Sequence, residues 1–415
     1  MKSLIEFIRQ FLSNQGLLVF LSSIISKLSM LFAAVIASNL ISPEEYGRIA
    51  LILSVFTICF PLLGMGSSQG LLRFGVLEKN KISKQQLSDY VFWKGFVNNI
   101  FISLIYIIVC IFYAWKYDGI LLISIFIGIR LTGYYFFNHI QAYYRMMDDN
   151  RTYSIMNIFT NLAGVALVAV LTYFFEMIGY LISMAVMPWF CLFYFKKNPF
   201  PVSKPKIDFR KFWHYSIHAS LTYFFSDLLF SMDYLLIGLM LNETSLALYK
   251  NAVMLPLSLS FLPLIFMQTD YPKIAKNYEN KTYLKFYIIN YYKIFIPIGI
   301  LTLIVGFFIK DWIVPFIFGE NYAGNGWVFF TILAALVGNM WMRNLYGNMS
   351  SAIGKAHWNT YTSVGALIII LLLGVLLIPS YGIMGAVIGM GAAFTFTGII
   401  GMILFHNYLR NLKHE

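Results

Sequence analysis

Residues 358–378, WNTYTSVGALIIILLLGVLLI, carry no charged side chain over 21 consecutive positions. An α-helix rises about 1.5 Å per residue and the hydrocarbon core of a bilayer is about 30 Å thick, so roughly 20 apolar residues cross it. Within lipid every backbone N–H and C=O must be paired inside the segment, which selects a helix. The stretch therefore predicts a transmembrane helix.

The rest of the chain repeats this pattern. Of its 415 residues, 59% are hydrophobic and only 12% are charged, with a mean hydropathy of +0.72. A soluble domain has a charged fraction of about a quarter, so that class is excluded. Twelve apolar runs follow one another, at 16–37, 46–66, 90–113, 119–144, 153–175, 178–195, 212–241, 245–267, 283–308, 327–350, 358–378 and 383–406.

The positions of Lys and Arg predict the orientation of these spans. With an even number of spans and the amino terminus in the cytoplasm, 21 of the 30 Lys and Arg residues fall in cytoplasmic loops, and only Lys116 and Lys310 fall in the opposite loops. Short loops rich in Lys and Arg stay in the cytoplasm. Both termini are therefore expected there. Because this topology explains the net charge of +12, we expect no nucleic-acid partner.

Similar sequences recur about 200 residues apart. Tyr46 and Tyr249 are separated by 203 positions, Pro61 and Pro263 by 202, and LISMAV near Gly179 is echoed near Gly385, 206 positions later. Two copies of six spans have the same orientation, which predicts two lobes related by a pseudo-two-fold axis along the membrane normal. The expected organisation is an interfacial amphipathic helix at 1–14, an amino-terminal lobe at 15–195, a basic cytoplasmic linker at 196–211, a carboxy-terminal lobe at 212–407 and a cytoplasmic tail at 408–415.

Seven basic residues remain within or at the edges of spans, where a charge costs about 2.5 to 3.5 kcal/mol and marks a function by default. Lys27 and Arg130 lie nearest the middle of theirs, and Arg130, Tyr134 and Asn138 share one helical face. Arg grips phosphate oxygens with a bidentate fork and Lys offers a point charge, so these groups suit an anionic lipid-linked cargo. For Lys250 and Arg343 substrate binding and structural pairing are equally open. The remaining three are Arg48, Lys94 and Lys293, which we expect to reach the nearer surface.

Two acidic residues lie within the seventh span. Asp227 continues a polar face formed by serines and a tyrosine, whereas Asp233 points about 120° away from it. Either residue is a candidate for coupling or gating, in which a carboxylate exchanges a cation for a proton or sodium ion. A static salt bridge is the alternative for Asp227.

Enzyme and metal signatures are missing. The sequence contains no G-x-S-x-G, Walker A or H-E-x-x-H pattern, and its three cysteines all lie inside apolar runs. The histidines show no spacing typical of metal ligands. We therefore expect a transporter without a cofactor other than a Na⁺ or H⁺ coupling ion, and without a metal site.

Several weak motifs occur in order along the chain. They are LISPEEYGRIAL at 40–51, GLLRFG at 70–75, QAYYRMMDDNRTYS at 141–154, DYLLIG at 233–238, YKNA at 249–252 and FIFGENYAGNG at 316–326. Together they resemble the polysaccharide transporter family, the O-antigen flippase-like branch of the multidrug/oligosaccharidyl-lipid/polysaccharide exporter superfamily. The resemblance covers essentially the whole chain.

The resemblance implies a flippase of the bacterial inner membrane that moves an undecaprenyl-diphosphate-linked oligosaccharide between leaflets. Membrane lipids and a polysaccharide polymerase or chain-length regulator would be its partners. A cation-coupled multidrug exporter and a lipid II flippase of the same superfamily are the alternatives. A glycosyltransferase or polymerase would need a longer extracytoplasmic loop than residues 310–326 provide.

Overall fold

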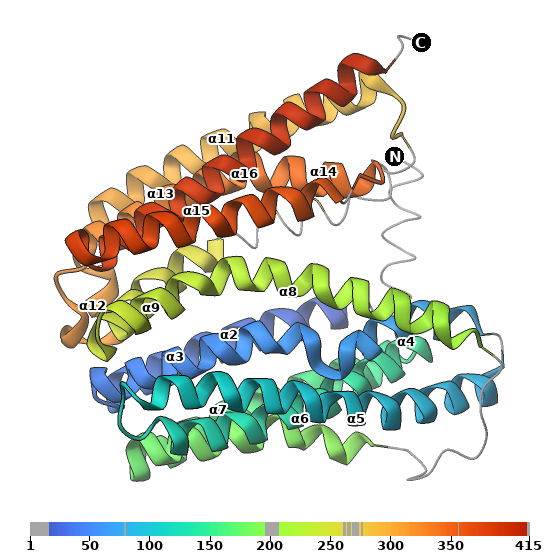
Figure 1. Cartoon of the computed structure of the whole chain (residues 1–415), viewed down its shortest axis with the longest axis horizontal. Helices are drawn as coiled ribbons and strands as arrows, with labels where there is room; N and C mark the ends of the chain where they lie inside the picture. The colour runs from blue at the N-terminus through green and yellow to red at the C-terminus, as the bar shows by residue number, and fades with distance from the viewer. Residues whose placement is uncertain are drawn as a thin grey trace. The chain divides into compact units, whose positions relative to one another are not determined.

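The computed structural model describes residues 16–78, 80–195, 207–259, 263, 267, 274, 277–355 and 357–412, and its regular structure there is entirely helical (Figure 1). Among these residues, ten helices are long and apolar enough to cross a membrane. The predicted all-α membrane class is therefore confirmed. The predicted amphipathic helix at 1–14 lies outside the described residues, as do most of the linker and the end of the tail.

By its internal contacts the chain divides into two compact units, Met1–Asp227 and Leu228–Glu415. The division falls inside one long helix, α8 (Phe209–Met240). The amino-terminal unit contains α2 (Gly16–Leu40), α3 (Pro43–Cys59), η1 (Phe60–Gly66), α4 (Ser67–Leu77), α5 (Lys81–Ala114), α6 (Ile120–Met146), α7 (Asn150–Val186), η2 (Met187–Tyr194) and the first part of α8.

The carboxy-terminal unit contains the rest of α8 and the remaining helices. These are α9 (Glu243–Leu259), α11 (Lys281–Ile309), α12 (Ile313–Phe318), η3 (Glu320–Tyr322), α13 (Gly326–Asn339), η4 (Met340–Asn344), α14 (Leu345–Ala352), α15 (His357–Tyr381) and α16 (Ile383–Asn411). Within this unit α15 packs along α16, and α13 contacts both α9 and α16.

The ten candidate spans and the twelve predicted runs differ at two places. The predicted fifth and sixth runs both lie within the continuous span Asn150–Tyr194. The backbone reverses inside it at Glu176, whose φ of 48° and ψ of −126° are not helical. The predicted eighth run begins in α9, which has 17 residues, and continues beyond residue 259 into residues that are not described.

Polar side chains cap the amino-terminal ends of several helices. Ser42 accepts a hydrogen bond from the Glu45 N–H at 3.3 Å, and Asn280 accepts one from the Tyr283 N–H at 2.8 Å. The Asp149 side chain accepts a hydrogen bond from the Thr152 N–H at 3.0 Å. The first backbone N–H groups of a helix have no partner within it, so these caps fix where α3, α11 and α7 start.

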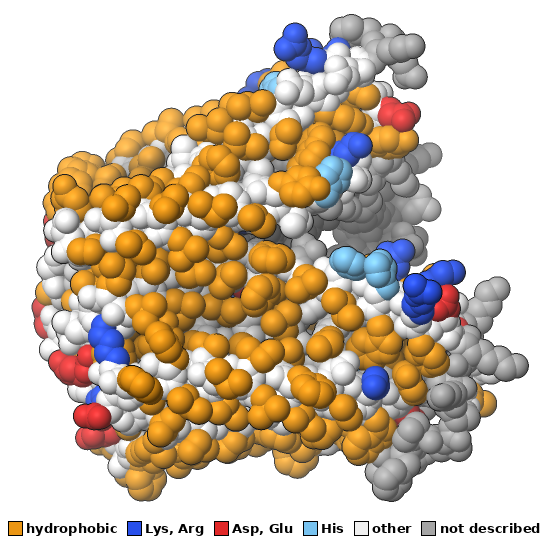
Figure 2. Space-filling model, viewed as in Figure 1, with side chains coloured by type: hydrophobic (Ala, Val, Ile, Leu, Met, Phe, Trp, Pro, Cys, Tyr) orange, Lys and Arg blue, Asp and Glu red, His pale blue; other side chains and the backbone are white. Residues whose placement is uncertain are grey.

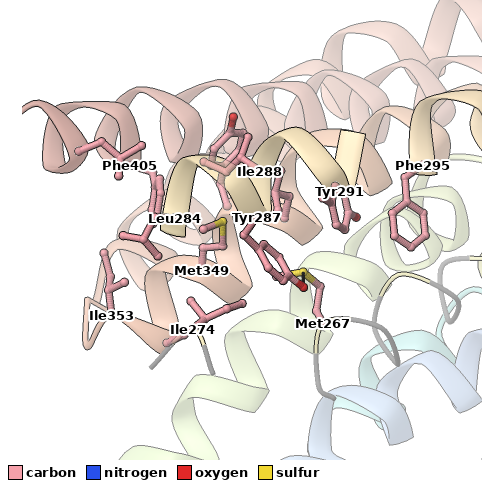
Figure 3. Packing of buried hydrophobic residues seen from close by; sticks show 14 of the residues in the cluster. Met267, Ile274, Leu284, Tyr287, Ile288, Tyr291, Phe295, Met349, Ile353 and Phe405 are labelled. Atoms are coloured by element: carbon pink, nitrogen blue, oxygen red, sulfur yellow. Dashed lines mark hydrogen bonds between the residues drawn. The ribbon is translucent and has the colours of Figure 1, made fainter. Parts of the chain in front are cut away.

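Hydrophobic side chains lie both inside the units and on their surfaces. Figure 2 shows them covering the sides of the helices, with most of the visible charged side chains near helix ends. One buried cluster of the carboxy-terminal unit brings α11 against α14 and α16 and includes Tyr291, Met349 and Phe405 (Figure 3). Apolar surfaces on both sides of a helix are expected when one side packs on protein and the other meets lipid.

Candidate functional site

Lys27 lies in the middle of α2, and its side chain is exposed. Ser22 and Ser29 on another face of this helix are buried, whereas Met30 beside Lys27 is 61% exposed. Within the described part of the chain, no carboxylate forms an ion pair with Lys27. The amino-terminal unit therefore presents an unneutralised cation at mid-span.

A network of amide side chains fixes the opposite face of α2 on α7. Ser26 Oγ donates to Asn161 Oδ1 at 3.3 Å, and Asn161 Nδ2 donates to the Asn157 carbonyl at 2.8 Å. Asn157 Nδ2 donates to the backbone carbonyl of Ser22 at 3.2 Å, and Gln141 Nε2 approaches Asn157 Oδ1 at 3.4 Å. Buried amides between membrane helices need such partners. The network determines which face of α2, and hence which way Lys27, points outward.

Arg130 on α6 is buried and has partners within its own unit. Its Nη1 donates to the backbone carbonyl of Met184 at 2.8 Å, and its Nη2 donates to Tyr134 Oη at 3.2 Å. The Met184 carbonyl would normally accept from the residue four positions later, which is Pro188 and has no N–H. Arg130 therefore donates to a carbonyl that a proline has freed.

The predicted polar face of α6 is present, but aromatic rings close part of it. Tyr134 packs edge-on against Phe56 and Phe60, at ring-centroid distances of 5.6 and 5.5 Å. The Arg130 guanidinium lies 5.5 Å from the Phe56 ring centre. Asn138, one turn further along, is half-buried. Arg130 and Tyr134 thus lie together, as the spacing predicted.

The second membrane span is broken at residues 63–66. Leu63 has ψ 124°, and Gly64, Met65 and Gly66 have φ of 58°, 52° and 71°. The Pro61 carbonyl, left outside a regular helix, accepts a 2.6 Å hydrogen bond from Ser220 Oγ of α8. Discontinuous membrane helices are common at transporter binding sites, where the freed backbone groups face a ligand or a neighbouring helix. Here α8 supplies a partner.

Asp227 does not share the environment of the serines on its predicted face. Ser216 and Ser220 are buried, Tyr223 is exposed and Asp227 is half-buried. Asp227 is the last residue of the amino-terminal unit. The salt bridge weighed for Asp227 is not formed with any residue in the described ranges.

Asp233 lies deep in the carboxy-terminal unit and is 1% exposed. The fully buried hydroxyl of Tyr249, on α9, donates to its Oδ2. The same hydroxyl lies 3.5 Å from Met390 Sδ on α16. A carboxyl group buried this deeply needs such hydrogen-bond donors to offset the cost of its burial.

Arg343 lies in the π-helical turn η4 of the carboxy-terminal unit. Its guanidinium stacks over two rings, 5.2 Å from the centre of Phe230 and 5.7 Å from that of Phe394. No carboxylate among the described residues pairs with it. Lys250 on α9 is half-buried and follows Tyr249 directly. The π-turn is notable because such turns occur frequently at functional sites.

The predicted residues are divided between the two units. Arg130, Tyr134 and the aromatic rings form one group, Lys27 projects from α2, and Asp233 and Arg343 lie in the other unit. Sequence reasoning missed Asn157, Asn161 and Tyr249. The two asparagines are four residues apart on the fifth run, so the face test applied to the fourth run would have found them. Nothing in the sequence signals the contact between Tyr249 and Asp233.

Solved structures share this arrangement of helices. An inward-facing multidrug resistance MATE family transporter of the MOP superfamily matches with a TM-score of 0.68 at 14% identity, covering 93% of this chain and 95% of that one. The lipid II flippase MurJ in an inward closed conformation matches with 0.70 at 14% identity, covering 95% and 90%.

A MOP superfamily transporter from Pyrococcus furiosus, described as having a binding pocket of reverse polarity that suggests a different function, matches with a TM-score of 0.61 at 14% identity. The match covers 97% of this chain and 96% of that one. At these identities the likeness establishes the fold alone. The comparison with curated proteins finds no match by sequence.

A family model relates the chain to known proteins by sequence. The model is described as polysaccharide biosynthesis protein and matches residues 12–278, which is well over half of the chain. Its match and the transporter fold agree with the order of motifs in the sequence. The protein is thus a multi-pass membrane protein whose fold is similar to that of MOP-superfamily transporters, and it belongs to the polysaccharide biosynthesis protein family.

Proposed function

We propose that this protein flips an undecaprenyl-diphosphate-linked oligosaccharide from the cytoplasmic to the outer leaflet of a bacterial inner membrane, for the synthesis of a surface polysaccharide such as O-antigen or capsule. Two six-helix lobes would alternate access to the cargo, with both termini in the cytoplasm. The observation that carries the proposal is Lys27, an exposed cation in the middle of a membrane helix that no described carboxylate neutralises.

The cost of placing a charge in lipid argues that the Lys27 ammonium group meets water rather than lipid tails. A Lys facing lipid at mid-span costs about 2.5 to 3.5 kcal/mol on insertion scales, whereas one facing water avoids most of that cost. An ammonium group in such a surface attracts an anion. A diphosphate passing through the membrane needs cations to replace its water, so the two requirements match.

Arg343 is the second cation available for an anionic cargo. Two aromatic rings hold its guanidinium without neutralising it. Arg130 contributes differently: it is committed to the Met184 carbonyl and to Tyr134, so it would shape the wall that Tyr134 and Asn138 share rather than bind phosphate. Lys250 remains a candidate for binding through its position beside Tyr249.

A multidrug exporter of the same fold is the less favoured function. Exporters of cationic drugs need acidic groups along the cargo path, whereas Lys27 and Arg343 place two unneutralised cations within spans, against the single acidic group Asp227. Lipid II carries the same diphosphate and polyprenyl chemistry, so a lipid II flippase is the nearer alternative. Family membership favours a polysaccharide precursor over lipid II.

Asp233 is our candidate for coupling transport to an ion gradient. Its burial and its bond from the Tyr249 hydroxyl suit a carboxyl that carries a proton in one conformation and loses it in another. Asp227, half-buried at the end of the amino-terminal unit, is the candidate for gating. The alternative coupling ion is sodium. An assay of export under a proton gradient and under a sodium gradient distinguishes the two ions.

Mass spectrometry of lipid-linked glycans tests the proposal. In a strain deleted for this protein, a complete undecaprenyl-diphosphate repeat unit should accumulate, and wild-type protein should clear it. Lys27→Ala should fail to clear it, whereas Lys94→Ala, which removes an exposed Lys from α5, should behave as wild type. With the upstream pathway confirmed active, absence of accumulation overturns the glycan cargo. Accumulated lipid II would assign the alternative.

A further inference from the structure

The span that contains Arg343 is interrupted by a π turn. Helix α13 ends at Asn339, the turn η4 covers Met340–Asn344, and α14 continues from Leu345. A π turn contains one more residue than an α turn, so side chains within and after it are rotated by up to about 100° relative to an uninterrupted helix. The direction in which Arg343 points therefore depends on this turn.

Tyr291 on α11 binds the backbone at the start of the turn. This residue is buried, and its hydroxyl donates a 2.8 Å hydrogen bond to the Met340 carbonyl. A π turn interrupts the regular ladder of backbone hydrogen bonds, and a buried carbonyl outside the ladder needs another donor. Because the carbonyls of a regular helix already have backbone donors, the Tyr291 bond favours the π turn over a regular helix.

Trp341, the second residue of the turn, is bonded to the same stretch of α11. Its indole Nε1–H donates to the Phe295 carbonyl at 2.7 Å. A Cβ on Gly299 would lie only 2.6 Å from the indole ring, so this glycine leaves the room that the ring occupies. Tyr291 and Phe295 lie one turn apart on α11, with their ring centres 4.4 Å apart (Figure 3). Two hydrogen bonds thus attach successive residues of η4 to α11.

A glycine of α16 also lies close against the turn. A Cβ on Gly398 would lie 2.7 Å from the Met342 Cβ and 3.4 Å from the Arg343 backbone nitrogen. Close packing of this kind fixes a backbone, because any displacement meets neighbouring atoms. The backbone of η4 is therefore held by hydrogen bonds from α11 and by packing against α16.

The Arg343 side chain extends from this fixed backbone to the rings of Phe230 and Phe394. Among the described residues, its N–H groups have no hydrogen-bond partner. Aromatic faces attract the charge of a guanidinium, but they do not use its N–H donors as a carboxylate would. The donors thus remain available for an anion.

We propose that Tyr291 and Trp341 are positioning residues for Arg343, and that the turn they hold directs the Arg343 guanidinium toward the diphosphate of the cargo. A guanidinium fork must be aimed accurately to meet two phosphate oxygens at once. A regular helix at this point would change the direction of Arg343 and misalign the fork. This role rests on the proposed function and adds the residues that prepare Arg343 for an anion.

Binding of undecaprenyl diphosphate to the full-length protein in detergent micelles, titrated by native mass spectrometry, tests this role. Arg343→Ala should weaken binding about tenfold through loss of a charge-assisted contact. Tyr291→Phe, which removes only the hydroxyl, should weaken binding about fivefold. In the Arg343→Ala background the same change should have no further effect, because the side chain that Tyr291 positions is absent. A merely structural loss would appear both with and without Arg343.

Tyr292→Phe is the matched control, because it removes a hydroxyl from the next residue of α11. That hydroxyl donates to Tyr346 Oη at 3.2 Å and not to the turn. The affinity of this variant should equal that of wild type. If Tyr291→Phe does not fold, Trp341→Phe, which removes the donor to the Phe295 carbonyl, takes its place in the same comparison with Arg343→Ala.

Three results overturn the positioning role. They are equal losses of affinity on Tyr291→Phe with and without Arg343, unchanged affinity in Tyr291→Phe, and wild-type affinity in Arg343→Ala. Glycan accumulation in the deleted strain decides the flippase function separately. Accumulation together with one of these results, or with no binding by the wild type, removes the positioning role alone. Absence of both accumulation and binding overturns the positioning role and the flippase function together.

Discussion

Glu176 and Gly382 have the same backbone conformation at equivalent turns, 206 residues apart. Glu176 has φ 48° and ψ −126°, and Gly382 has φ 56° and ψ −137°. Three residues after each turn a glycine lies against the preceding helix: a Cβ on Gly179 would lie 1.8 Å from the Leu171 carbonyl oxygen, and one on Gly385 would lie 2.5 Å from that of Leu377. These two helical hairpins have the same local geometry, which supports the internal repeat read from the sequence.

Glu176→Gly should stabilise the protein, and Gly382→Glu should destabilise it. A positive φ is strained for Glu and unstrained for Gly, and such strain costs about 1 to 3 kcal/mol. The greater freedom of unfolded glycine offsets part of the gain, so we expect about 1 kcal/mol for Glu176→Gly. Thermal unfolding in detergent measures both. A lower Tm for Glu176→Gly would contradict the strain.

Gly66→Ala should destabilise the amino-terminal unit by more than its backbone alone requires. A Cβ there would lie 2.2 Å from the Ser216 carbonyl oxygen, and φ is 71°. Gly354 has a φ of 78° but open space around its Cβ, so Gly354→Ala isolates the backbone cost of about 1 kcal/mol. We expect at least about 2 kcal/mol in addition for Gly66→Ala. Equal decreases in Tm for Gly66→Ala and Gly354→Ala would show that α8 does not pack closely against Gly66.

Arg130→Ala should lower stability, whereas Lys27→Ala should not. Loss of the guanidinium leaves the buried Met184 carbonyl without its donor, at a cost of about 2 kcal/mol. Lys27 is exposed and forms no ion pair with a described carboxylate, so its loss should change export and leave Tm within about 0.5 kcal/mol of wild type. Arg130→Lys, which can still donate to Met184, should recover part of the stability. A wild-type Tm for Arg130→Ala would make Arg130 a candidate for binding the anionic cargo again.

Asp233→Asn should uncouple transport from its driving ion while keeping the fold. The amide oxygen can still accept from Tyr249, but the side chain no longer exchanges a proton. We expect glycan export at least about tenfold slower and insensitive to a pH gradient, a change of about 1.4 kcal/mol in barrier. Asp227→Asn, which changes the other carboxyl group of α8, is measured in the same export assay for comparison. Export that still follows the gradient in Asp233→Asn would move the coupling site elsewhere.

The start of α8 should respond to acid. The backbone N–H of Lys211 donates to Asp208 at 3.2 Å, and this bond, with the Lys211 charge and the Arg210 N–H, holds the pKa of Asp208 below its ordinary value of 3.8. A lowered pKa means that the stabilisation is present above the ordinary value and is lost as the pH falls through the lowered one. Hydrogen exchange in the first turn of α8, corrected for intrinsic rates, should rise below about pH 4 in wild type and stay flat in Asp208→Asn. Equal profiles would contradict the capping role.

Much of the fold could be predicted because membrane spans are local properties. Apolar runs of about 20 residues must form helices in lipid whatever they pack against, so the runs at 283–308 and 358–378 correspond closely to α11 and α15. The reversal at Glu176 was predicted as a boundary between runs, but its strained backbone was not, since Glu has no preference for a positive φ.

The candidate site was only partly predictable. Helical spacing placed Arg130 beside Tyr134 because both lie on α6, one turn apart. Spacing within one helix cannot reveal a partner on another, which is why the Met184 carbonyl and the Tyr249 hydroxyl were unforeseen. The direction in which Lys27 points likewise depends on Asn157 and Asn161, on a helix far along the chain.

By itself the sequence determined an all-α membrane protein, the residues that carry charge within its spans, and its family. These follow from composition, period and motif order, which need no knowledge of neighbours. Only the tertiary structure decided which of those charges are engaged and which remain exposed. Arg130 is engaged with the Met184 carbonyl because Pro188 lacks an N–H, whereas Lys27 is exposed because α2 packs on α7 through its other face.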